Sequence, residues 1–177
     1  MLLSSVIGIY SLVILSALLG KPFAWIPYLI GFIPLRITGG GYHAKTHFAC
    51  IVSFSLVFLF LLALSDTICL IPYIYFILAC ISLGTTYFLA PVEAVNKPLS
   101  SEIRQKNRKR CVGISWINIT ASLAVLIIGI SHELYITMYF TGIFSAGVSM
   151  VVVFLRDYQE KNIKRKAARS KLFGKFS

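Results

Sequence analysis

The chain has 177 residues, of which 58% are hydrophobic and 13% are charged, and its mean hydropathy is +0.83. A soluble domain carries roughly 25% charged residues, so this composition excludes a soluble globular protein and indicates an integral membrane protein. The formal net charge is +11, with six basic residues between Lys97 and Arg110 and eight between Arg156 and Lys175.

Both basic clusters flank apolar segments and contain few aromatic residues. This pattern favours retention on the cytoplasmic side and contact with anionic lipid headgroups, and it argues against nucleic acid as a partner. The four cysteines show no paired spacing, so no disulfide framework is expected. Three of them are interpreted as small buried hydrophobes: Cys69, Cys80 and Cys111.

Apolar segments of nearly bilayer-spanning length follow one another along the chain. A spanning helix needs about 20 apolar residues, and the segments 1–19, 23–35, 47–65, 67–90, 111–131 and 134–155 approach or meet this length. The second segment is short and is interrupted by Pro27 and Pro34, which predicts a bent, tilted or re-entrant helix. We therefore predict an all-α, polytopic membrane protein with about six transmembrane helices.

A single helical membrane domain over residues 1–177 accommodates these segments, and no secretory signal is expected at its start. Its predicted parts are an N-terminal hairpin (1–35), a polar loop (36–46), the remaining spans (47–155) with a basic loop (91–110), and a basic tail (156–177).

The charges predict the orientation of these parts. The basic loop and the basic tail should both lie on the cytoplasmic side. Counting spans backwards from them then places the polar loop 36–46 on the same side. Arg36 and Lys45 within that loop agree with this placement, although they were not used to derive it. If the first two segments both cross, the amino terminus is cytoplasmic as well.

The residues best suited to catalysis are His43 in the polar loop and Cys50 just after it. Three glycines, 39–41, predict a turn before His43. Thr46 can cap the following helix, which places Cys50 in its first turns, where the positive end of the helix dipole favours a thiolate. A nearby imidazole that accepts the thiol proton would complete an activated nucleophile.

Geometry sets a condition on this interpretation. Seven residues on one helix rise about 10 Å, too far for a direct hydrogen bond, so the backbone must bend between residues 43 and 46. Alternatives are an interfacial histidine beside an inert cysteine, or a metal site, because His43, His47 and Cys50 have helical i, i+4, i+7 spacing. A zinc peptidase would carry a glutamate at the position of Ala44. We expect neither a metal nor another cofactor.

The motif around these residues resembles the core of the accessory gene regulator B (AgrB) family, membrane peptidases of Gram-positive quorum sensing. The family pattern falls without a gap on Arg36, Gly41, His43 and Cys50. A second similarity is the Ala-Pro … Lys-Pro segment from Ala90 to Pro98, which opens the basic loop. The sequence departs from the family at its start, because members usually carry an amphipathic segment before the first span.

The resemblance implies a cysteine endopeptidase in the cell membrane whose substrate is an AgrD-like propeptide. Cys50 would cleave the peptide bond before the acidic tail with His43 as base and then acid, and the thioester would be resolved into a cyclic thiolactone or lactone pheromone. Arg36, Gly41 and Thr46 would support the site, and a homodimer is implied. Residues expected to guide the substrate are Glu93, Lys97, Arg104, Lys106 and Arg108.

Two non-enzymatic functions compete with this one. A small permease or export component would line a path with its polar loop, but acidic and basic residues are nearly absent inside the spans, whereas transport routes usually contain them. A structural membrane subunit with a lipid-binding tail is the other alternative.

Overall fold

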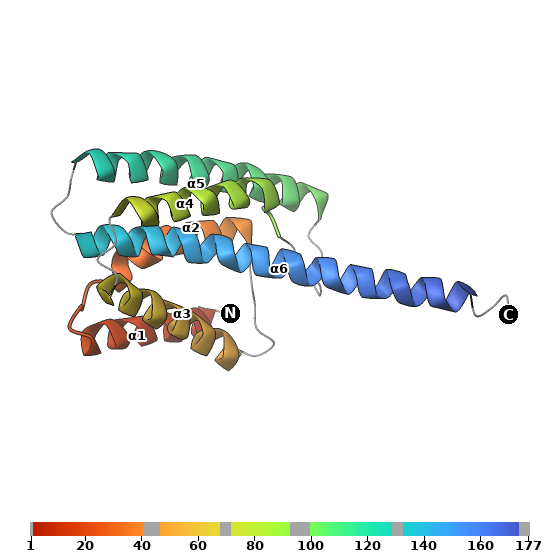
Figure 1. Cartoon of the computed structure of the whole chain (residues 1–177), viewed down its shortest axis with the longest axis horizontal. Coiled ribbons are helices and arrows are strands. Elements are labelled where there is room, and N and C mark those ends of the chain that lie inside the picture. The colour runs from red at the N-terminus through yellow and green to blue at the C-terminus, as the bar shows by residue number, and fades with distance from the viewer. Residues whose placement is uncertain (1, 41–46, 68–71, 93–99, 129–132, 174–177) are drawn as a thin grey trace.

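The computed structural model describes residues 2–40, 47–67, 72–92, 100–128 and 133–173, and the regular structure in these ranges is helical. It contains six helices: α1 (Leu2–Leu18), α2 (Trp25–Gly39), α3 (His47–Thr67), α4 (Pro72–Leu89), α5 (Ser101–Ile128) and α6 (Glu133–Phe173). They form an elongated bundle from which the second half of α6 projects (Figure 1). The predicted all-α class with six helices, several of them apolar, is confirmed.

Neither Pro27 nor Pro34 breaks α2. Pro27 lies in the first turn, where an amide hydrogen would have no partner within the helix. Pro34 lies inside the helix, and the hydroxyl of Thr38 donates to its carbonyl oxygen at 2.8 Å. The helix continues to Gly39, so Arg36 belongs to its last turn and not to the predicted loop.

Two other boundaries differ from the sequence-based prediction. The second half of the predicted basic loop is the beginning of α5, and α6 runs through the basic tail to Phe173. Both stretches are rich in Arg, Lys, Gln and Glu, which have high helix propensity. A helix of 28 residues is about 42 Å long, so α5 can cross a core of about 30 Å and still extend its charged turns beyond it.

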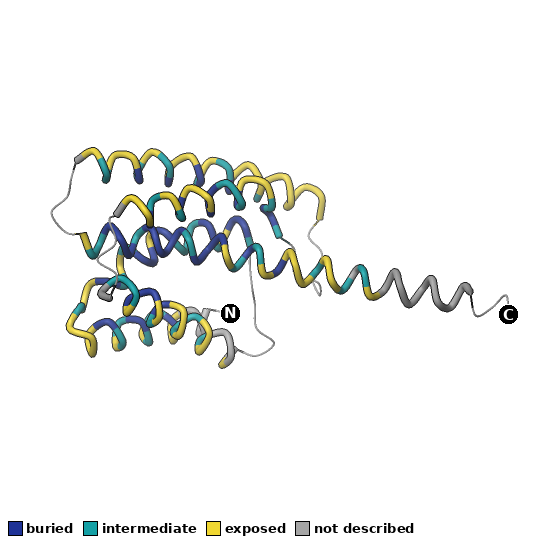
Figure 2. Tube along the Cα trace, in the orientation of Figure 1, coloured by how far each residue is buried: buried dark blue, intermediate teal, exposed yellow. Residues whose placement is uncertain are grey.

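The centre of the bundle is the contact between α2 and α6. A Cβ added at Gly142 would collide with the carbonyl oxygen of Tyr28, and one added at Gly31 would come within 3.1 Å of the backbone nitrogen of Ile143. The two backbones therefore touch at these glycines, as is common where membrane helices pack closely. Figure 2 shows that the buried residues concentrate along this pair.

Two clusters of buried side chains lie on either side of this central pair. One joins α2 with α4, α5 and α6 and includes Leu35, Leu83 and Phe140. The other joins α1 and α3 to α2 and α6 and includes Tyr28 and Phe58. Although α1 and α2 are consecutive, α1 packs mainly against α3, whereas α2 packs mainly against α6 and α5.

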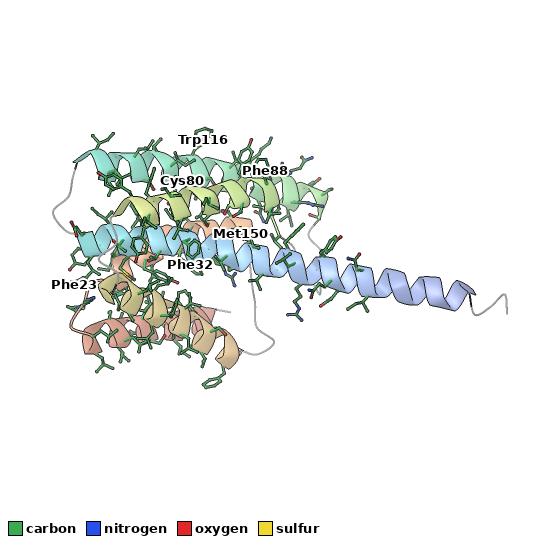
Figure 3. The ribbon with its side chains drawn as sticks, viewed as in Figure 1. Phe23, Phe32, Cys80, Phe88, Trp116 and Met150 are labelled. Atoms are coloured by element: carbon green, nitrogen blue, oxygen red, sulfur yellow. The ribbon has the colours of Figure 1, made fainter. Side chains whose placement is uncertain are left out.

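The outer surface of the bundle is apolar. Within the described residues, Ser101–Ile127 and Glu133–Glu160 are long and apolar enough to cross a bilayer, and three further apolar helices are shorter: Val6–Leu18, Ile51–Ser65 and Tyr73–Leu89. Large side chains such as Phe88 and Trp116 point outward from α4 and α5 (Figure 3). Lipid acyl chains can cover such a surface, whereas soluble proteins rarely expose apolar surface of this extent to water.

One end of the bundle collects the segments that the sequence predicts on one side of the membrane. The start of α1, the end of α2, the start of α3, the end of α4 and the start of α5 all lie at the end from which α6 projects, at the right in Figure 1. We call this end, with residues 36–40, 47–50, 89–92, 100–110 and 149–156, the motif end.

Candidate functional site

The helix that contains Cys50 begins where the sequence predicts it. α3 starts at His47, so Cys50 is its fourth residue and lies in the first turn at the motif end. The side chain of Cys50 and residues 41–46, among them Gly41, His43 and Thr46, lie outside the described part of the structure. Glu93 and Lys97 also lie outside it. The proposed proximity of His43 and Cys50 therefore stays a prediction.

Arg36 is half-buried and connects α2 to α6. Its Nη1 donates to Ser149 Oγ at 3.2 Å, and the hydroxyl of Ser149 lies 2.7 Å from the carbonyl oxygen of Ala146 in its own helix. A guanidinium has several donors in one plane and can therefore hold more than one partner. This contact fixes the last turn of α2, from which the chain continues toward His43.

The glycine turn is the next part of the motif end, and it contacts the Ala-Pro segment directly. The amide of Val92 donates to the carbonyl oxygen of Gly39 at 2.9 Å. Gly40 adopts φ 77° and ψ −159°, a region essentially restricted to glycine. A Cβ at Gly40 would also collide with the carbonyl oxygen of Val92. The two motifs that carry the family resemblance thus meet through their backbones.

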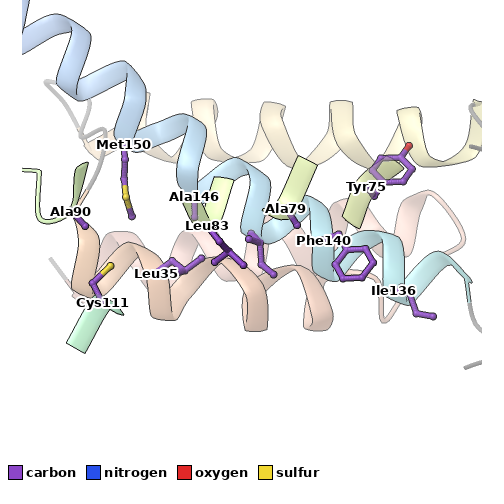
Figure 4. Close-up of a cluster of buried hydrophobic side chains, with 11 residues drawn as sticks. Leu35, Tyr75, Ala79, Leu83, Ala90, Cys111, Ile136, Phe140, Ala146 and Met150 are labelled. Carbon is purple, nitrogen blue, oxygen red and sulfur yellow. The ribbon is translucent and has the colours of Figure 1, made fainter. Parts of the chain in front are cut away.

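Buried side chains support this turn from within the bundle. A Cβ at Gly39 would collide with the terminal methyl of Met150 and would lie 3.3 Å from Cys111 Sγ. Met150 is fully buried, and Cys111 is 1% exposed. Figure 4 shows both side chains beside Leu35 and Ala90 at this end of the core cluster. Residues of α5 and α6, together with the segment that follows α4, therefore pack around Gly39 at the end of α2.

The cysteines differ in their surroundings. The expectation of a buried thiol is confirmed for Cys111. It is wrong for Cys80, which is exposed. The face of α4 that packs against α6 carries the buried Ser82, whose hydroxyl donates to the carbonyl oxygen of Ile143, and Cys80 lies on another face. Cys69 lies outside the described residues.

The basic residues expected to guide the substrate lie on the first turns of α5. Arg104, Lys106 and Arg108 are all exposed at the motif end. Further along α6, Arg156 pairs with Glu160 at 3.3 Å on the helix surface. The described residues include no group of three or more His, Cys, Asp or Glu side chains that could hold a metal ion.

Sequence reasoning did not identify Ser149 or Met150 as parts of this region. No local signal could have revealed them, because each contacts a residue more than 50 positions away in the chain. Val92 belongs to the Ala90–Pro98 motif, but its contact with the glycine turn was not predicted. The three glycines 39–41 were predicted to form a turn, and the structure gives Gly39 and Gly40 a separate contact each.

Comparison with known proteins identifies the group to which the chain belongs. Searches of curated proteins and of solved structures gave no match. The family model described as accessory gene regulator B matches residues 1–155, which include all six apolar segments and both motifs. The protein is therefore a member of the AgrB family, the polytopic quorum-sensing membrane proteins that process the AgrD peptide.

Proposed function

We propose that this protein is a cysteine endopeptidase that removes the C-terminal tail of an AgrD-like propeptide and leaves a peptide that closes to a cyclic thiolactone or lactone. The observation that carries the proposal is the family match over residues 1–155, within which the residues of the first motif are complete. Membership implies processing of the AgrD peptide; the cysteine mechanism and the assignment of its residues are the proposal.

Cys50 is the nucleophile. Its place in the first turn of α3 supports this role, because the positive end of the helix dipole favours a negatively charged thiolate. The thiolate attacks the carbonyl carbon of the peptide bond before the tail, and the carbon–nitrogen bond breaks. His43 accepts the thiol proton and delivers it to the leaving amine. The product is a thioester between the pheromone region and Cys50.

Ring closure follows from the same thioester. A thiol or hydroxyl within the bound peptide attacks the thioester carbonyl, and the bond to Cys50 Sγ breaks. The proton of the attacking thiol or hydroxyl passes to the departing Cys50 thiolate. Exchange of one thioester for another is nearly isoenergetic, so a thiolactone forms without ATP. The reaction as proposed uses no cofactor and no metal.

We place this chemistry at the cytoplasmic face of the cell membrane. The two basic clusters support this orientation, because positive residues are retained on that side. Arg104, Lys106 and Arg108 would attract the acidic tail of the propeptide, and both clusters would contact anionic lipid headgroups. A homodimer is part of the proposal through the family resemblance.

The test is co-expression with the small propeptide gene beside its own, followed by mass spectrometry. We expect Cys50→Ala and His43→Ala to insert normally and to lower processing by roughly 10³-fold or more, as the loss of a catalytic member does in other nucleophilic peptidases. A pheromone–enzyme adduct sensitive to hydroxylamine should accumulate when the ring-closing residue of the peptide is replaced.

Matched controls use the same residue types at other places. Cys80→Ala removes an exposed thiol from the outer surface of α4, and His132→Ala removes a histidine from the segment between α5 and α6. Both should process the propeptide at the wild-type rate. Normal processing by Cys50→Ala would exclude the cysteine mechanism and favour a permease or export component.

A further inference from the structure

Gly40 has two independent requirements for glycine. Its backbone lies at φ 77° and ψ −159°, which side chains of L-residues rarely allow. Its α-carbon also lies so close to Val92 that a Cβ would collide with the Val92 carbonyl oxygen. Gly20 shares the first property with φ 73° but has nothing within 4 Å of its Cβ position. Contact with another segment therefore distinguishes Gly40.

A backbone hydrogen bond also holds Val92 beside the glycine turn. The Val92 amide donates to the carbonyl oxygen of Gly39 at 2.9 Å, so adjacent glycines contact the two sides of one residue's backbone. These contacts involve backbone atoms only and join positions more than 50 residues apart. We call Gly39, Gly40 and Val92 the backbone clamp.

The clamp rests on a rigid part of the molecule. Gly39 packs on Met150 and Cys111, both of which are buried, and one turn earlier Arg36 donates to Ser149. These contacts attach the end of α2 to α5 and α6. The clamp thus fixes the point at which the chain leaves the core on one side toward His43 and on the other toward Glu93.

We propose that the backbone clamp positions His43 for its reaction with Cys50, and that Gly40 is its essential member. This inference rests on the proposed function. His43 follows Gly40 by three residues, whereas Cys50 belongs to a separate helix that packs mainly against α1. Residues 41–46 connect Gly40 to α3, and the clamp anchors the first end of this connection. A shift of that end would displace His43, and small displacements of reacting groups cost large factors in rate.

Gly40→Ala in the full-length protein tests the clamp. The measurements are kcat and KM for propeptide cleavage, and the pH profile of Cys50 alkylation by iodoacetamide, followed by peptide mapping. We expect kcat to fall about 10- to 100-fold with KM nearly unchanged. The alkylation profile should shift toward that of His43→Ala, because a misplaced imidazole no longer assists the thiolate. A role in folding alone would not move this profile.

Two glycine variants serve as controls. Gly20→Ala introduces a similar positive-φ strain at the turn between α1 and α2, without a neighbouring atom. Gly84→Ala adds a methyl group on α4 where nothing lies within 4 Å. Both should keep the wild-type kcat and the wild-type alkylation profile.

A second variant keeps the test decisive if Gly40→Ala does not accumulate. Val92→Pro removes the amide donor of the clamp and keeps its carbonyl group, and Val92→Ala shows the effect of losing the side chain alone. We expect kcat of Val92→Pro to be at least threefold below that of Val92→Ala, with the same shift of the alkylation profile. Equal kcat and equal profiles for these two variants would overturn the clamp, even if Gly40→Ala is absent from the membrane.

The same data separate the clamp from the proposed function. If alkylation of Cys50 in the wild-type protein does not depend on His43, the assignment of the reacting pair is wrong. If it does depend on His43, and Gly40→Ala and Val92→Pro retain wild-type kcat and profile, the pair stands and the clamp is wrong.

Discussion

The helix that precedes His43 and the helix that carries Cys50 are held in the bundle in different ways. α2 contributes to both buried clusters, and its Tyr28 and Leu35 are fully buried. α3 is buried chiefly in its second half, where Phe58 and Leu62 pack against the other helices, whereas Phe48 near its start is 77% exposed.

This difference shows how the two predicted reacting groups are supported. The chain reaches His43 from the end of α2, where Gly39 packs on the buried Met150 and Cys111 and Gly40 contacts the backbone of Val92. It reaches Cys50 on a helix joined to α1 by contacts such as the 2.7 Å hydrogen bond between Ser11 and Ser55. The proposed pair therefore joins two helices with different main neighbours, α6 for α2 and α1 for α3. Its geometry depends on how α2 and α3 are held relative to each other.

The largest effect should follow from disrupting the central pair. Gly142→Leu places a side chain against the carbonyl oxygen of Tyr28, and the backbone of α2 cannot move aside without opening both clusters. Such overpacking costs about 3 kcal/mol, or a fall of about 6–12 °C in melting temperature. Thermal unfolding of detergent-solubilised protein measures it. The control Gly113→Leu adds the same side chain in open space on α5; an equal loss in both variants would refute a special role for the α2–α6 contact.

A smaller loss of stability is expected from a change in the buried half of α3. Phe58 is fully buried and meets the ring of Tyr28 edge-on with centroids 5.1 Å apart, whereas Phe60 on the same helix is 66% exposed. Phe58→Leu should lower stability by about 1 kcal/mol through loss of this aromatic contact. The processing rate should fall only modestly, because the clamp on α2 is untouched. Phe60→Leu should be neutral in the same melting experiment, and similar losses for both would mean that α3 is not anchored at its buried half.

The smallest effect concerns the start of α5. Replacing the exposed Arg104, Lys106 and Arg108 by glutamine should raise the KM for an acidic-tailed propeptide several-fold at low ionic strength and leave kcat unchanged. The difference should shrink in physiological salt, where charges are screened over about 8 Å. Processing assays with acidic-tailed and neutral-tailed substrates measure it.

Two controls accompany this variant. Lys164, Lys166 and Arg169 carry the same charge in the tail, and their replacement by glutamine should change KM less. A Lys45→Cys substitution, in protein lacking its native cysteines, reports orientation through an impermeant thiol reagent and should stay unlabelled from outside intact cells. Unchanged KM for both substrates in a correctly inserted triple variant would leave the start of α5 as an anchor only.

The sequence was sufficient for the parts that depend on local composition and order. Apolar runs predicted the six helices, because each must satisfy its own backbone hydrogen bonds in lipid, and the spacing of Arg36, Gly41, His43 and Cys50 predicted the family. The start of α5 and the end of α6 were harder to predict, because charge indicates where a helix leaves the bilayer and not where the helix itself begins or ends. The exposure of Cys80 was not predicted, although the small polar residues Ser82 and Thr86 of α4 are buried and Ser82 contacts α6.

Only the tertiary structure decided which helices touch and what the glycines do. Nothing in the sequence indicates that α2 packs on α6 while α1 packs on α3, since in lipid every apolar face is an acceptable outer surface and pairing is decided by shape. The contact of Gly40 with Val92 arises from the same cause. It exists because α2 and α4 end side by side at the motif end, and it joins two backbones whose sequence separation carries no signal of their proximity.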